Sequence, residues 1–123
     1  MAIVFSEKTQ EIHIFNRWIS YIIQIMDNGE LSNLYFGKRI GHKDDFSYLL
    51  EGGLRSLAVY TKENDYFMSP QYTRMEYPCT GTGDFREPAF SVRQSDGSHV
   101  VHLKYQGYTV YAGKNALDGL PAT

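Results

Sequence analysis

The stretch WISYIIQIMDNGELSNLYFG, residues 18–37, is the longest apolar run in the chain, and a turn signal interrupts it at Asp27-Asn28-Gly29-Glu30. Asn-Gly is the pair that best accepts the two positive φ angles of a tight type I′ turn. The runs on either side of Asn28 and Gly29 are therefore predicted to pair as antiparallel strands. This pattern indicates a soluble β domain and by itself says nothing about chemistry.

The two faces of this predicted hairpin differ in polarity. With Asn28 and Gly29 as the loop, Tyr21 lies opposite Phe36, and Ile25 lies opposite Ser32. One face is wholly apolar: Ile19, Tyr21, Ile23 and Ile25. The reverse face mixes apolar and polar side chains: Trp18, Ser20, Ile22, Gln24 and Met26. We expect the mixed face either to be half-solvated or to be covered by something that this chain does not contain.

Length and composition favour a single soluble domain. The chain has 123 residues, which fits one domain with a real core, and a net charge of -2 gives no basic field for nucleic acid or an anionic membrane. No stretch approaches the roughly 20 apolar residues of a membrane helix. Ten Tyr, seven Phe and eleven Gly favour strands and turns. The single cysteine, Cys79, excludes an internal disulfide and suits a reducing cytosol, so we expect a cytoplasmic protein.

Two shorter strands are predicted before the hairpin. Residues Ile3 to Phe5 and Glu11 to Phe15 flank the polar turn Ser6 to Gln10, and EIHIF alternates. Its parity places His13 on the face opposite its isoleucines, so His13 is expected at the surface. No second ligand stands at a spacing that would make a metal site with it. We expect neither a metal nor a cofactor.

A long excursion, Arg39 to Tyr72, follows the hairpin without sustained alternation. Long ordered loops in compact domains are often binding or interface elements, and a plain solvated loop is the alternative. The adjacent carboxylates Asp44 and Asp45 are read as a hydrated charge cluster, because neighbours in an extended chain point apart.

The glycine-rich run Gly81 to Pro88 lacks the flanking strand and helix of a phosphate-binding loop, so a nucleotide site is discounted. A structural role is predicted instead. Asp84 can accept backbone N–H groups within the turn, and Arg86 can pair with a carboxylate such as Glu76 or Glu87. Phe85 can anchor the loop to the core.

A second hairpin is predicted from alternation on both sides of the Asp96-Gly97 turn, with Phe90 to Gln94 pairing with Val101 to Tyr105. A further strand, Tyr108 to Ala112, would extend it into a meander. With the first hairpin, these strands imply an all-β fold, an antiparallel two-sheet β-sandwich.

Four blocks of the sequence carry a family resemblance: LYFGK (Leu34 to Lys38), EYPCTGTGDFREPAF (Glu76 to Phe90), the DGS turn (Asp96 to Ser98) and GKNALDGLPAT (Gly113 to Thr123). Together they resemble the N-terminal region of bacterial glycoside hydrolase family 36 α-galactosidases. The resemblance implies a galactose-mutarotase-like β-supersandwich that precedes a catalytic (β/α)8 barrel. It also implies a retaining enzyme that releases terminal α-galactose from sugars such as melibiose and raffinose.

The same resemblance implies that the catalytic residues lie elsewhere. Both reacting carboxyls of this family are aspartates on the barrel, one of them in a KWDMNR-like stretch, and nothing in this chain matches that stretch. We therefore expect no catalytic residue here and no hydrolysis by these residues alone. The chain is expected to be cut from a longer polypeptide, with its own barrel as its main partner.

The resemblance also indicates where this domain would meet substrate. Relatives are often tetramers in which the excursion reaches toward a pocket, and there an acidic residue before an arginine can touch the sugar. The matching pair here is Leu54-Arg55, with Leu54 in the acidic position. Asp84 and Arg86 match a family motif as well, for which we expect a structural or interface role. The implied partners are thus a galactoside and further copies of the protein.

Two other hypotheses remain open at this stage. A stand-alone carbohydrate-binding module would stack sugars on aromatics in and beside the excursion: Tyr60, Tyr66, Phe67 and Tyr72. A pure oligomerisation module would use the same strands only for assembly.

Overall fold

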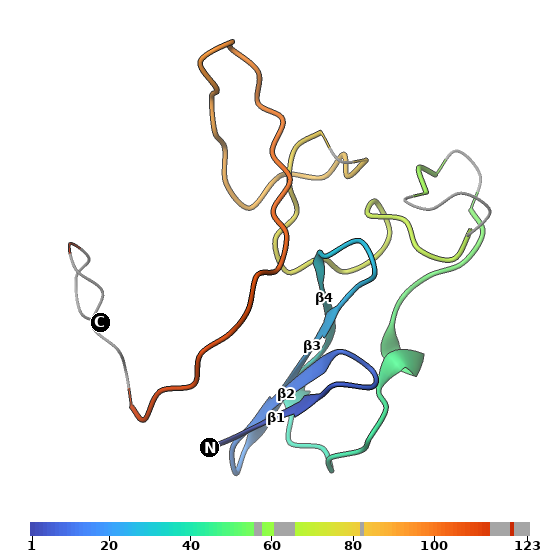
Figure 1. Cartoon of the computed structure of the whole chain (residues 1–123). Helices are drawn as coiled ribbons and strands as arrows, with labels where there is room; N and C mark the ends of the chain where they lie inside the picture. Colours follow the sequence, from blue (N-terminus) through green and yellow to red (C-terminus); the bar gives the residue numbers. More distant parts are fainter. Residues whose placement is uncertain (56–57, 61–65, 82, 114–118, 120–123) are drawn as a thin grey trace.

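The computed structural model describes residues 1–55, 58–60, 66–81, 83–113 and 119 (Figure 1). Four strands, β1 (Ala2–Ser6), β2 (Glu11–Phe15), β3 (Ile19–Ile25) and β4 (Leu31–Lys38), form one antiparallel sheet in the order β1-β2-β3-β4. One short 3-10 turn, η1 (Ser47–Leu49), follows β4. The predicted all-β, antiparallel character is confirmed, as are both early strands. The described residues contain this one sheet.

The β3–β4 hairpin forms as predicted, but its loop is of another type. Met26 N–H donates to the Glu30 carbonyl at 2.9 Å, and Gly29 N–H donates to the Met26 carbonyl at 2.8 Å, which leaves a three-residue loop. Gly29 has a φ of 83°, whereas Asn28 is not among the described residues with positive φ. The predicted type I′ turn is therefore wrong. Gly29 alone supplies the left-handed residue, as in a turn followed by a bulge.

This loop shifts the register by one residue, and a bulge restores it. Near the loop Ile25 pairs with Leu31, not with the predicted Ser32. Farther along, Tyr21 pairs with Phe36 as predicted. The change occurs between Ile22 and Ile23, where Leu34 is the additional residue of β4.

The buried face of the sheet is the mixed one. Ile22 and Leu34 are almost fully buried and form a cluster with Phe46 of the loop after β4. Residues 39–50, which we call the strap, supply this cover, so both alternatives considered for the mixed face are wrong. The wholly apolar face is partly open, and Phe36 on it is 67% exposed.

The second hairpin is not formed as strands. Its turn exists, because Gly97 has a φ of 86° and donates to the Gln94 carbonyl at 3.0 Å. Residues 90–112 are otherwise extended without a ladder, and Figure 1 shows this orange part of the chain running away from the sheet. Val101 and Tyr105 donate to separate segments, at Thr80 and Gly29, so no continuous partner is available to complete a strand.

Much of the C-terminal block that carries the family resemblance lies outside the described residues. Of Gly113 to Thr123, the structure describes residues 113 and 119.

Candidate functional site

The loop at Asp84 is held by an arginine two residues later. Arg86 Nε lies 2.9 Å from Asp84 Oδ1, and Arg86 Nη2 lies 2.7 Å from Asp84 Oδ2, which makes a forked pair. The Arg86 backbone N–H also donates to Asp84 Oδ1 at 3.0 Å. Asp84 is only 6% exposed. Burial alone would raise the pKa of Asp84, but the hydrogen bonds and charge of Arg86 outweigh it and hold that pKa below its ordinary value.

The same guanidinium ties this loop to a second segment. Arg86 Nη2 donates to the carbonyls of Pro70 at 2.6 Å and Thr73 at 2.8 Å. Three acceptors thus converge on one cation, and removing that cation would leave buried acceptors unpaired.

Two details of the predicted loop are wrong. Glu76, one of the carboxylates proposed for Arg86, instead accepts hydrogen bonds from the Tyr21 hydroxyl and from Asn33 Nδ2. Burial and this contact raise the pKa of Tyr21 above its ordinary value. Phe85 is 77% exposed and does not anchor the loop. The acceptance of a backbone N–H by Asp84 is confirmed.

Leu54 and Arg55 lie on the excursion. Leu54 is 78% exposed, whereas the Arg55 guanidinium lies 4.7 Å from the centre of the Tyr72 ring. The Tyr60 hydroxyl receives the Arg55 backbone N–H at 2.6 Å and donates to the Arg55 carbonyl at 2.9 Å. Aromatic side chains therefore shape the backbone that presents Leu54.

The two predicted residue pairs meet around one segment, residues 70–73. Arg55 packs on Tyr72 within it, and Arg86 binds two of its carbonyls. Gly83 adds a direct link, because a Cβ built there would lie 2.9 Å from Val59 Cγ1 of the excursion. The structure thus places the excursion and the Asp84–Arg86 loop side by side.

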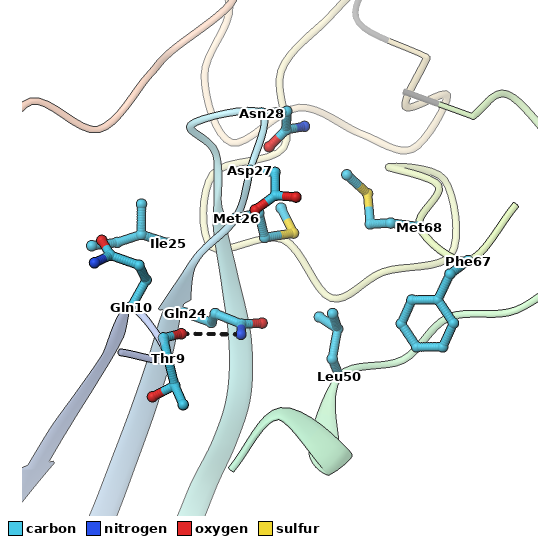
Figure 2. Close-up of a pocket in the computed structure, with 10 residues that line it drawn as sticks. All are labelled: Thr9, Gln10, Gln24, Ile25, Met26, Asp27, Asn28, Leu50, Phe67 and Met68. Atoms are coloured by element: carbon cyan, nitrogen blue, oxygen red, sulfur yellow. Dashed lines mark hydrogen bonds between the residues drawn. The ribbon is translucent and has the colours of Figure 1, made fainter. Parts of the chain in front are cut away.

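A pocket of about 480 Å³ opens beside the hairpin loop (Figure 2). Its apolar wall includes Leu50 and Phe67, which lie across from Gln24 and Met26 in this view. The ring of Phe67 packs on Gly52, where a Cβ would lie 2.6 Å from Phe67 Cε1. None of the ten described lining residues carries a positive charge, so the pocket offers no counter-charge for a phosphate or carboxylate.

Sequence reasoning missed a contact between the buried His13 and the exposed His42. His13 Nδ1 lies 3.0 Å from His42 Nδ1, and His13 Nε2 lies 3.1 Å from Ser20 Oγ. His13 is 1% exposed, so its predicted surface position is wrong. The parity argument located its face correctly, but that face is the one that the strap covers. The contact could have been predicted only from the position of His42. The excursion has no periodic pattern, so its sequence did not indicate where His42 would lie.

A buried carboxylate lies on the same face. Both oxygens of Glu11 lie 3.0 Å from the backbone nitrogen of Phe46, which donates its N–H to the carboxylate. Burial raises the pKa of Glu11 above its ordinary value, and the Phe46 N–H partly opposes that rise. Glu11 therefore fixes the strap at its most deeply buried residue.

Within the described part of the chain, no group of three His, Cys, Asp or Glu side chains is arranged to hold a metal ion. In the same residues, no helix is long and apolar enough to cross a membrane. Cys79 is buried, and its Sγ lies 3.3 Å from the Tyr77 carbonyl oxygen.

Comparison with known proteins relates the whole chain to one family of enzymes. The model of the glycosyl hydrolase family 36 N-terminal domain matches residues 29–123. α-Galactosidase AgaA of Geobacillus stearothermophilus is 32% identical over 124 residues, an alignment that covers 100% of this chain and 17% of AgaA.

Solved structures agree with this match. The crystal structure of the α-galactosidase from Lactobacillus brevis superposes with a TM-score of 0.88 at 35% identity and covers 98% of this chain and 16% of that one. A variant of AgaA in complex with raffinose gives a TM-score of 0.80 at 32% identity and covers 92% of this chain and 16% of that one. The chain thus spans about a sixth of the length of these relatives.

Proposed function

Because the chain belongs to the glycosyl hydrolase family 36 N-terminal domain family, we propose that it is the non-catalytic N-terminal domain of an α-galactosidase. The observation that carries this proposal is the alignment itself. Relatives named as α-galactosidases match this chain along 97% to 100% of its length, while the chain covers 16% or 17% of theirs. In this proposal the reacting carboxyls belong to a (β/α)8 barrel outside these residues.

We further propose that the domain is completed as a two-sheet sandwich by chain outside the described residues. The open apolar face of the sheet supports this, since Ile19 and Phe36 are both exposed there. So do the extended residues 90–112, whose alternating apolar side chains at Val92, Leu103 and Tyr108 are exposed as well. Exposed apolar surface of this extent is typical of an interface.

The site residues receive distinct roles in this proposal. Leu54 faces solvent on a backbone fixed by Tyr60, which suits a contact with substrate or with a neighbouring subunit. Asp84 and Arg86 hold the adjoining loop against residues 70–73 and so support the same surface. The substrate would be a terminal α-galactoside such as melibiose or raffinose, because a variant of AgaA was solved with raffinose bound.

Assembly into a homo-oligomer and a cytoplasmic location also belong to this proposal. The exposed side chain of Leu54 supports the former. The presence of a single cysteine, which allows no internal disulfide, supports the latter.

The test compares two proteins, one expressed from the complete reading frame and the other limited to residues 1–123. The first should release p-nitrophenol from p-nitrophenyl α-galactoside and galactose from melibiose and raffinose, and the second should release neither. Hydrolysis by residues 1–123, or a complete protein that lacks α-galactosidase activity, would contradict the proposal.

A further inference from the structure

The strap, residues 39–50, is joined to the sheet by polar side chains of β2 and β3. Ser20 Oγ receives the Ile40 backbone N–H at 3.1 Å, His13 contacts His42, and Glu11 receives the Phe46 N–H. These three connections are spread along the strap. They lie around the Ile22–Leu34–Phe46 cluster, so the strap and the core depend on each other.

The contact between His13 and His42, the central one of the three, depends on how many protons the two imidazole rings hold. A hydrogen bond between two Nδ1 atoms needs one protonated nitrogen and one bare nitrogen. The contact is therefore compatible with two neutral rings or with one imidazolium, and it is incompatible with two imidazolium ions. Burial lowers the pKa of His13, and the neighbouring His42 and Arg39 lower it further.

The other charged groups around His13 and His42 do not make the contact compatible with two imidazolium ions. Arg39 adds positive charge, and its guanidinium lies 4.1 Å from the centre of the Phe15 ring. Glu11 is the carboxylate that acts on His42, and Asp45 of the strap acts on Glu11 in turn. His13 is the buried ring of the two, at 1% exposed, so it is the ring that must stay neutral while the strap is closed.

We propose that residues 39–50 form an acid-opened strap. Opening separates His13 from His42, lets His13 take up a proton, and uncovers the Ile22–Leu34 face. Since the strap is the first part of the excursion and continues directly into the residues that carry Leu54 and Arg55, its opening also loosens that part of the chain. In this last respect the inference rests on the function proposed above.

The size of the pH effect on strap opening follows from proton linkage. An open state in which His13 titrates near its ordinary value binds one proton more than the closed state. Between pH 6.5 and pH 5.5 this difference raises the opening equilibrium about fivefold. Glu11 acts in the opposite direction, because its raised pKa favours the closed state as that carboxyl takes up its proton.

Hydrogen exchange of the protein expressed from its complete reading frame tests the proposal. The backbone amides of Ile40 and Phe46 report on the strap, and the amide of Gly53, which donates to the Phe67 carbonyl at 2.6 Å, reports on the excursion. After correction for the pH dependence of chemical exchange, opening at these amides should rise about fivefold between pH 6.5 and pH 5.5. The Ile25 amide, which donates to the Gln10 carbonyl next to the start of β2, should not change.

Two variants separate this mechanism from general acid sensitivity. His42→Asn keeps an amide that can bond to His13, and its amide oxygen can also accept a hydrogen bond from a protonated His13, so the rise in opening at Ile40 between pH 6.5 and pH 5.5 should be smaller than in the unmodified protein. The matched control is His99→Asn, which alters an exposed histidine and should behave as the unmodified protein.

Two results would overturn the proposal: protection in the unmodified protein that is independent of pH, or a rise in His42→Asn equal to that in His99→Asn. Gly53 protection that stays constant while Ile40 opens would overturn the link to the excursion. If His42→Asn does not fold, the ring ¹⁵N spectrum of the unmodified protein decides. A His13 ring that is protonated at pH 5.5 with the strap closed contradicts the mechanism. Because exchange requires no substrate, these results stand apart from the α-galactosidase assay.

Discussion

Truncation of Leu34 tests which face of the sheet holds the core. Leu34 is 1% exposed and packs with Ile22 and Phe46, so Leu34→Ala removes buried methyl groups and leaves a cavity. Such substitutions cost about 2–5 kcal/mol, and the cost is lowest where the surroundings can collapse. Because one wall of this cavity is the strap and not a strand, we expect Leu34→Ala to lower the free energy of unfolding by about 3 kcal/mol. That loss is a large part of the stability of a domain of this size.

The matched control lies two residues away on the same strand. Phe36 is 67% exposed, and its ring approaches that of Tyr21 edge to face at 5.6 Å between ring centres. Phe36→Ala should therefore cost about 1 kcal/mol. Urea unfolding of residues 1–123, followed by circular dichroism, measures both values. A loss for Phe36→Ala that equals or exceeds the loss for Leu34→Ala would refute the assignment of the buried face.

Three further predictions concern the loops around the sheet. Arg86→Lys should lower the free energy of unfolding by about 2 kcal/mol, because an ammonium cannot form the forked pair and also reach two carbonyls; thermal unfolding measures it. Gly52→Ala should displace the aromatic wall of the pocket and lower the melting temperature, whereas Gly41→Ala, which meets no atom within 4 Å, should not. The depressed pKa of Asp84 contributes stability that is present above its ordinary value of 3.8 and is lost as the pH falls through the folded value. Acid unfolding of Asp84→Asn should accordingly show a weaker dependence on pH than the unmodified chain.

The sequence was sufficient for the strands whose side chains alternate. Residues 11–15 and the two arms of the Asn-Gly hairpin were located correctly, because alternation and turn chemistry are local properties. The buried face was not predictable in the same way. Ser20 looks like a solvent residue, but its hydroxyl bonds to the strap, and the strap has no periodic pattern that would reveal its position.

The candidate site shows the same division. The acceptance of a backbone N–H by Asp84 was predictable from turn chemistry, whereas the partner of Arg86 was one of several acidic residues within reach. Leu54 and Arg55 were identified as candidate site residues only through the family resemblance. Their relation to residues 70–73 is a long-range contact that no local pattern encodes.

The Leu34 bulge has a consequence for length variation within the hairpin. The three-residue loop displaces the ladder by one position and the bulge displaces it back, so the pairs of Ile25 and Tyr21 follow two different offsets. Loss of one residue at either place alone would turn the side chains between them to the opposite surface of the sheet. Insertions and deletions in this hairpin should therefore be tolerated in compensating pairs, one near Gly29 and one near Leu34, and selected against singly.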